Sequence, residues 1–120
     1  MGLTTWTRRF HFQCVHTLQT GAHSERLHGH WYELEVSSRA DGPVTRAHAD
    51  MIVASQILNH VHGQDLSAVL APSVATGETL VEWIHARLQA TELGTQVLAV
   101  ALQETRKNRF ISAASEARFV

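Results

Sequence analysis

Three histidines in the first quarter of the chain have the residue type and spacing of a metal site. His28 and His30 flank a single glycine, and His16 precedes them. Three neutral imidazoles with one open position form a typical catalytic zinc site, whereas structural zinc is normally closed by four protein ligands. Because Cys14 is the only cysteine, a site built from several cysteines is excluded. The residues therefore predict an open zinc site, with the alternative that the histidines merely end apolar strand faces.

Alternation of apolar and polar residues predicts two strands that would position these histidines. Over residues 8–16 and 28–36, every second residue shares one face, and that face contains Phe10, Phe12, Cys14, His16, His28, His30, Tyr32, Leu34 and Val36. Side chains two apart on a strand lie roughly 6 to 7 Å apart, so His28 and His30 can converge where the strand bends at Gly29. Residues 17–27 are polar and turn-rich and predict a loop; if it folds back as a hairpin, His16 lies beside the other two.

Two helices and two further strands are expected after these elements. A helix is predicted over residues 50–61, with Gly63 as the residue that terminates it. A second helix is predicted to begin after the N-cap Thr76 and to end near Gly94. Residues 96–105 predict a strand whose apolar face ends at Glu104, and residues 110–114 a short fourth strand. The order is ββααββ, which predicts a single α+β domain over residues 1–120.

Composition narrows the classes of partner. The chain has 120 residues, 44% hydrophobic and 18% charged, with a formal net charge of -1, which argues against nucleic acid or an anionic membrane as the main partner. The N-terminal residues do not resemble a signal peptide, and no segment approaches the ~20 apolar residues of a membrane helix. We therefore expect a cytoplasmic protein.

Four motifs follow one another along the chain: F-x-x-x-H at Phe12 to His16, L-H-G-H at Leu27 to His30 followed by Tyr32, A-T-x-E-x-L-x-x-W-I at Ala75 to Ile84, and Q-E-T at Gln103 to Thr105. Together, and in this order, they resemble the family of 6-pyruvoyl-tetrahydropterin synthase and 6-carboxytetrahydropterin synthase. The resemblance spans about residues 8–113. It implies the tunnelling fold, in which a four-stranded antiparallel sheet with two helices on one face joins others into a barrel, as a trimer or as a hexamer of two trimers.

The resemblance also implies roles for individual residues. His16, His28 and His30 match the three ligands of Zn2+, which would act as a Lewis acid on the side chain of a dihydropterin triphosphate substrate. Glu104 matches the carboxylate that accepts hydrogen bonds from the pterin ring. Thr76 lies in the segment that helps to build the pterin pocket across a subunit boundary, and is either a pocket residue or only a helix cap.

Two departures from the family pattern concern proton transfer. Ser24 stands where enzymes that make the pyruvoyl or carboxy product have a cysteine, and a hydroxyl is far less acidic than a thiol. The nearest counterpart of the family's Asp-His pair is Val61-His62. The histidine is kept, although its spacing along the chain differs by one residue, and the aspartate is replaced by valine. Asp65 is a candidate to orient His62, and an exposed His62 without a catalytic role is the alternative.

Glu25 suggests a different reaction. One branch of the family replaces the cysteine by a glutamate, in the form E-x-x-H-G-H, and Glu25 to His30 fits that form. Members of this branch cleave the side chain of 7,8-dihydroneopterin triphosphate to give 6-hydroxymethyl-7,8-dihydropterin, and a carboxylate base suits that step. Three readings stay open: a zinc-dependent lyase of the carboxy or pyruvoyl type, as in queuosine biosynthesis, the folate-type cleavage, and a non-catalytic pterin-binding homologue that has lost the cysteine and aspartate of the family site. For Glu25 itself, the alternative is a solvated loop residue.

Overall fold

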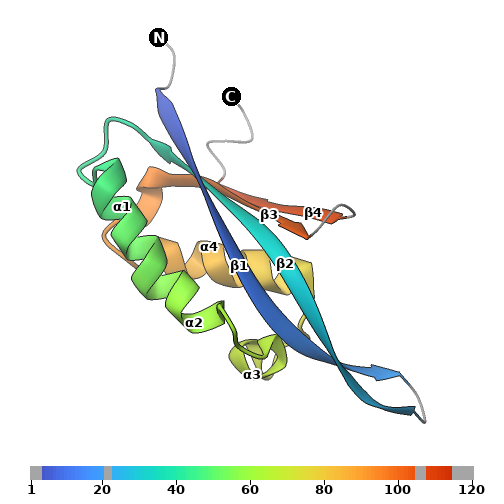
Figure 1. The fold of residues 1–120 in the computed structure, drawn as a ribbon. Coiled ribbons are helices and arrows are strands. Elements are labelled where there is room, and N and C mark those ends of the chain that lie inside the picture. Colours follow the sequence, from blue (N-terminus) through green and yellow to red (C-terminus); the bar gives the residue numbers. More distant parts are fainter. Residues whose placement is uncertain (1–3, 21–22, 105–107, 115–120) are drawn as a thin grey trace.

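The protein folds around one antiparallel sheet that is covered by helices on one face (Figure 1). The computed structural model describes residues 4–20, 23–104 and 108–114, and it describes the side chains of residues 4–15, 31–104 and 108–114. The strand order is β1-β2-β3-β4, and the strands are β1 (Thr5–Thr20), β2 (His23–Arg39), β3 (Val97–Glu104) and β4 (Asn108–Ala113).

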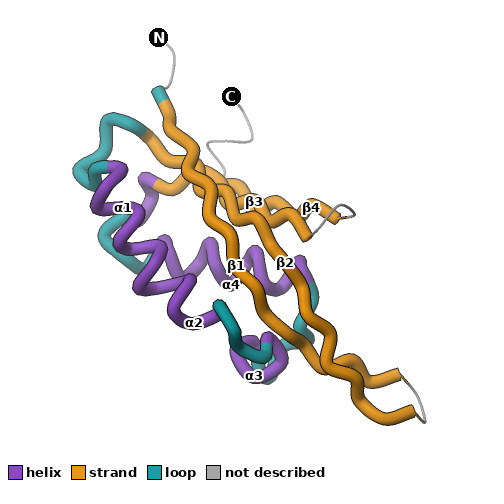
Figure 2. Tube along the Cα trace, viewed as in Figure 1, coloured by secondary structure: helices purple, strands orange, loops and turns teal. Residues whose placement is uncertain are grey.

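The helices lie between β2 and β3 in the chain and pack against the same side of the sheet (Figure 2). They are α1 (Arg46–Val53), the π-helical turn η1 (Ala54–Leu58), α2 (Asn59–Val61), α3 (Leu66–Leu70) and α4 (Gly77–Gln89), followed by the 3-10 turn η2 (Gly94–Gln96). Because α1, η1 and α2 are continuous, the predicted ββααββ order is confirmed, with α3 as an addition.

The β1–β2 hairpin is longer than the sequence predicted. The loop expected over residues 17–27 is wrong, because β1 continues to Thr20 and β2 begins at His23. Pairing of Thr17 with Leu27 and of Leu18 with Arg26 satisfies the backbone groups of this polar segment in a ladder. The hairpin therefore extends past the helices, as the lower right of Figure 1 shows.

Capping explains why several helix boundaries differ from those predicted. The first helix begins at Arg46 and not at residue 50, because the Thr45 side chain accepts a hydrogen bond from the His48 N–H. In the predicted loop after Gly63, Asp65 caps the short helix α3 in the same way, by accepting from the Ser67 N–H at 2.9 Å. At the other end of the layer, α4 ends at Gln89, before the predicted Gly94.

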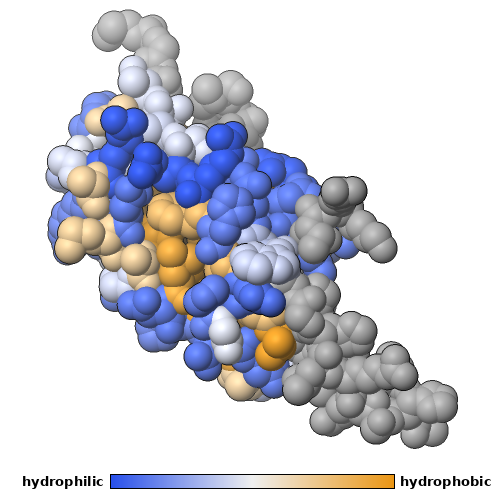
Figure 3. Space-filling model, in the orientation of Figure 1, coloured by the Kyte–Doolittle hydropathy of each residue, from blue (hydrophilic) through white to orange (hydrophobic). Residues whose placement is uncertain are grey.

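The hydrophobic core lies between the helices and the sheet. Its largest side chains with almost no exposure come from both layers, and they include Phe12, Leu34, Val36, Ile57, Val61, Leu80, Ile84, Leu88 and Leu102. The opposite face of the sheet is charged, and there Arg9 and Arg109 both pair with Glu35. Figure 3 shows a hydrophobic band in the middle of one face, flanked by hydrophilic surface. Within the described residues, no helix is both long and apolar enough to cross a membrane.

Candidate active site

Backbone pairing between β1 and β2 brings together the positions of the three predicted zinc ligands. His16 pairs with His28, and Cys14 pairs with His30. Partners in an antiparallel ladder lie on the same side of the sheet, so these four positions share one face. The side chains of the three histidines lie outside the described residues. Among the residues that were described, no group of three or more histidine, cysteine, aspartate or glutamate side chains could hold a metal ion.

The ladder also sets the spacing of these positions. Gln13 and Val15 have backbone groups that point away from β2, toward the segment after α2. The Gln13 carbonyl accepts from the Gly63 N–H at 2.6 Å, and the Val15 N–H donates to the Gln64 carbonyl at 3.0 Å. The N–H and C=O groups of successive residues in a strand point to opposite edges, so those of residues 14 and 16 point toward β2. The pairs at positions 14 and 16 are therefore the hydrogen-bonded pairs of the β1–β2 ladder, with Cα atoms ~5.5 Å apart. Three imidazoles from an array of roughly 5.5 by 6.8 Å can reach one ion, since zinc binds histidine nitrogen at about 2.0 to 2.1 Å. The backbone spacing of positions 16, 28 and 30 is therefore compatible with the predicted set of three histidine ligands.

Glu104 lies on the same face of the sheet as these histidine positions. The ladders pair Phe12 with Tyr32 and Tyr32 with Glu104, so the three residues form a row across β1, β2 and β3. The Phe12 and Tyr32 rings are stacked, with centroids 5.2 Å apart. Because His30 is two residues from Tyr32, the row lies about 7 Å along the strand from the histidine positions.

Electrostatic coupling shows that Cys14, Tyr32 and Glu104 form one cluster. Burial, and secondly the charge of Glu104, raises the pKa of the Cys14 thiol to about 12. The pKa of the Tyr32 phenol is raised as well. Burial is the largest cause, and interactions with the charges of Glu104 and Cys14 raise it further. Both groups therefore remain protonated at neutral pH. Cys14 is fully buried and cannot take the place of the family's reactive cysteine as a ready base.

The N-terminus of α4 lies close to the same end of the sheet. Thr76 caps this helix, because its hydroxyl accepts from the Thr79 N–H at 3.1 Å and its own N–H donates to the Thr79 hydroxyl at 3.0 Å. The next residue, Gly77, packs so closely on Phe110 of β4 that a methyl group there would overlap the ring. The cap predicted for Thr76 is confirmed, and its exposed position leaves the predicted binding role as a prediction.

His62 follows α2 and is held against the outer edge of β1. Its Nδ1 accepts a hydrogen bond from the Gln13 N–H at 3.2 Å, and the segment after it forms a parallel bridge in which Val15 pairs with Asp65. The Asp65 carboxylate caps α3 by binding Ser67. The contact that His62 makes at Nδ1 is thus with a backbone N–H, and a role of Asp65 in orienting His62 stays a prediction.

Comparison with known families identifies the group to which this arrangement belongs. The family model described as 6-pyruvoyl tetrahydropterin synthase matches residues 5–114. The chain belongs to the 6-pyruvoyl tetrahydropterin synthase family. None of the curated proteins matches the sequence significantly. The antiparallel sheet with helices on one face is the tunnelling fold of this family, so the predicted fold class is confirmed.

Solved structures share this fold with the chain. The 6-pyruvoyl tetrahydropterin synthase of Caenorhabditis elegans superposes with a TM-score of 0.77 at 22% identity, covering 96% of this chain and 98% of that one. That of Plasmodium falciparum gives a TM-score of 0.55 at 14% identity, over 92% and 99% of the two chains. An uncharacterised protein of Wolinella succinogenes gives 0.57 at 14% identity, over 93% and 99%.

Membership in the 6-pyruvoyl tetrahydropterin synthase family supports a pterin-synthase type of function and an enzyme of the lyase type. Proteins of this family are oligomeric, bind pterins and typically depend on a metal. Ser24 and Glu25, on which the choice of reaction rests, have side chains outside the described residues. Tyr32 was not among the predicted site residues, although its place on the histidine face of β2 already pointed to the site.

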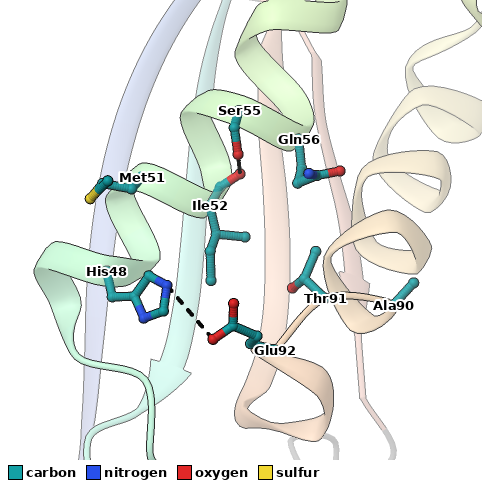
Figure 4. Close-up of a pocket in the computed structure, with 8 residues that line it drawn as sticks. All are labelled: His48, Met51, Ile52, Ser55, Gln56, Ala90, Thr91 and Glu92. Carbon is teal, nitrogen blue, oxygen red and sulfur yellow. Dashed lines mark hydrogen bonds and ion pairs between the residues drawn. The ribbon is translucent and has the colours of Figure 1, made fainter.

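A cleft of the protein lies away from these residues. The cleft, of about 540 Å³, separates the α1–η1 segment from the C-terminal end of α4 (Figure 4). His48 Nε2 lies 3.7 Å from a carboxylate oxygen of Glu92 across it. The cleft contains none of the predicted site residues, and its lining consists of His48, Met51, Ile52, Ser55, Gln56, Ala90, Thr91 and Glu92.

Proposed function

We propose that this protein is a zinc-dependent lyase that acts on 7,8-dihydroneopterin triphosphate or a close dihydropterin. The observation that carries the proposal is the β1–β2 register, which gathers positions 16, 28 and 30 on the sheet face that also contains Glu104. His16, His28 and His30 would hold the ion. When bound there, Zn2+ supplies a Lewis acid that makes hydroxyl groups of the substrate side chain more acidic.

The other residues of the cluster would bind and orient the pterin. A carboxylate has two acceptor oxygens, so Glu104 can accept hydrogen bonds from the amino group and a ring N–H of the pterin at once. Cys14 and Tyr32 support this role because both stay protonated beside Glu104 and add no second negative charge. Thr76 is our candidate for a further pterin contact from the N-terminus of α4.

The folate-type reaction is the second candidate, and the state of Cys14 favours it. Formation of the pyruvoyl or carboxy product relies in the family on a cysteine where this chain has Ser24. Since the pKa of Cys14 is raised to about 12, the only cysteine of the chain cannot supply a thiolate in its place. Glu25 remains as the base that takes a hydroxyl proton while the side chain is cleaved to leave 6-hydroxymethyl-7,8-dihydropterin, and His62 would assist it.

Product analysis tests this proposal. The purified protein is incubated with 7,8-dihydroneopterin triphosphate, and products are separated by chromatography and identified by mass. Formation of 6-hydroxymethyl-7,8-dihydropterin supports the Glu25 reaction, whereas release of triphosphate or a carboxy product supports the other lyase reactions. Unchanged substrate that nevertheless binds measurably would favour the non-catalytic pterin-binding homologue.

Two matched variants assign the base. We expect Glu25→Ala to abolish turnover in the folate-type reaction, while Ser24→Ala, the neighbouring control, leaves it largely intact. Activity that survives Glu25→Ala would point instead to Ser24 with His62. For the metal, we expect zinc in the purified protein and less zinc in His28→Ala. A protein without metal, whose His28→Ala variant binds the pterin as well as the wild type, would contradict the proposal.

A homo-oligomer, as a trimer or hexamer, is part of the proposal. β1 and β4 are the two edge strands of the sheet, and exposed strand edges pair readily with other strands. Closure of several sheets into a barrel would pair both edges and shelter a site at the end of the sheet. Light scattering coupled to size-exclusion chromatography measures the mass, and a monomer at assay concentration would contradict this part.

A further inference from the structure

The contact between His62 and β1 fixes which ring nitrogen is available to a ligand. His62 Nδ1 accepts from the Gln13 N–H at 3.2 Å. This bond is one of three between the segment after α2 and the outer edge of β1, the others being Gly63 N–H to Gln13 O at 2.6 Å and Val15 N–H to Gln64 O at 3.0 Å. The imidazole is therefore bound by a backbone N–H, and the two neighbouring hydrogen bonds fix the backbone that carries His62 against β1.

A ring whose Nδ1 accepts a hydrogen bond carries its proton on Nε2. Neutral imidazole has one N–H and one acceptor nitrogen, and the bond made by one nitrogen determines the state of the other. To take up a further proton, His62 would have to bind it at Nδ1, where it would face the Gln13 N–H. Both donors would then point at each other, and the hydrogen bond would be lost. This geometry opposes a role as proton acceptor.

We propose that neutral His62 uses its Nε2–H as a hydrogen-bond donor to an oxygen of the substrate, and is not the base of the reaction. This inference rests on the proposed function. No proton leaves the ring, so the histidine orients or polarises the acceptor oxygen while a different group removes the proton. A neutral imidazole serves as an electrophile of this kind in other enzymes. The acceptor is either a hydroxyl oxygen of the pterin side chain or a phosphate oxygen.

The place of His62 in the fold agrees with this role. Its side chain is exposed, and it contacts Gln13, the neighbour of Cys14, which pairs with His30. His62 thus lies at the edge of the sheet at the level of the predicted zinc ligands. The residue before it is the buried Val61, which cannot orient an Nδ1–H as an aspartate would.

Nuclear magnetic resonance tests the tautomer without any assay of activity. In uniformly 15N-labelled protein near pH 8, long-range 15N–1H correlations distinguish a protonated from an unprotonated ring nitrogen, and the His62→Gln variant assigns the signal. We expect a proton on Nε2 and none on Nδ1. A proton on Nδ1 would overturn the inference.

Two variants test the role in the reaction. Asparagine places an oxygen near the position of Nδ1 and can keep the bond from Gln13, but has no group at Nε2; glutamine places an N–H near the position of Nε2. We expect His62→Asn to fold and to lose about tenfold or more in kcat/KM, the effect of removing a donor to a polar or charged acceptor, and His62→Gln to retain most of the activity. Equal loss in both folded variants would indicate a base and overturn the inference, as would full activity in both.

Comparison of two ligands identifies the acceptor oxygen. If it belongs to phosphate, His62→Asn weakens binding of 7,8-dihydroneopterin triphosphate but not of 7,8-dihydroneopterin; if it belongs to the side chain, binding of both is weakened. A wild-type protein that neither binds nor converts these pterins would refute the proposed function and the substrate contact together. The tautomer measurement would then still decide whether Gln13 fixes His62 as described.

Discussion

Cys14 is expected to be almost unreactive in the folded protein, although it lies between the predicted zinc ligands and the predicted pterin anchor. Its side chain is fully buried, and burial followed by the charge of Glu104 raises its pKa from 9.0 to about 12. Each pKa unit changes the thiolate fraction tenfold near neutral pH, so the fraction falls about 1000-fold. Since the thiolate is the nucleophile, alkylation should be at least that much slower than in the unfolded chain.

The assay compares iodoacetamide labelling of Cys14 at pH 7.5 with and without guanidinium chloride, after a chelator has removed bound metal. Glu104→Gln is the informative variant, because it removes the second cause of the shift and should raise the native rate while leaving the larger cause, burial, in place. Labelling of the native wild type at the rate of the unfolded chain would refute the reasoning. It would also restore Cys14 as a candidate for the missing family cysteine.

Three further predictions concern stability. Replacing Gln96 by Ala should lower the free energy of unfolding by about 1–3 kcal/mol in urea titration, because its side chain satisfies two carbonyls and one N–H at the β2–α1 turn, and wild-type stability would contradict this. His85 is buried with Nδ1 2.7 Å from the Ser112 hydroxyl, and burial lowers its pKa below the ordinary 6.5. The folded state then binds fewer protons than the unfolded state below that value, so stability should fall as pH drops from 6.5 through the lowered pKa, and His85→Gln should reduce the dependence. Gly77→Ala should cost about 1–3 kcal/mol by thermal or urea unfolding, because its methyl group overlaps the Phe110 ring, and a variant as stable as the wild type would refute this.

The strands that carry the site could be predicted from the sequence because strand alternation is a local property. The pleat sends every second side chain to one face, so the pattern from Phe12 to His16 and from His28 to Leu34 already placed the histidines with the core residues. Glu104 was placed by the same rule at the end of an apolar row. The Thr76 cap was also predictable, because a cap depends on residues within one turn of the helix.

The extent of the hairpin and the π-helical turn within the first helix were missed for a related reason. Residues 17–27 are polar and contain turn formers, and it is the pairing of residues 17–20 with residues 23–27 that makes these two stretches extended. The π-helical turn within the first helix has a partner from another element, since Arg87 of α4 donates to the Gln56 carbonyl at 2.7 Å. Local propensity does not contain these distant hydrogen bonds.

By itself, the sequence determined which residues share a face: the three histidines, the apolar row of each strand and the carboxylate that ends the third one. Only the tertiary structure decided that His16 lies opposite His28, that Tyr32 lies between Phe12 and Glu104, and that Gln13 binds His62. These are pairings between residues far apart in the chain. They depend on the register of the strands and on the docking of a loop on a strand edge, and both are set by the packing of the whole core.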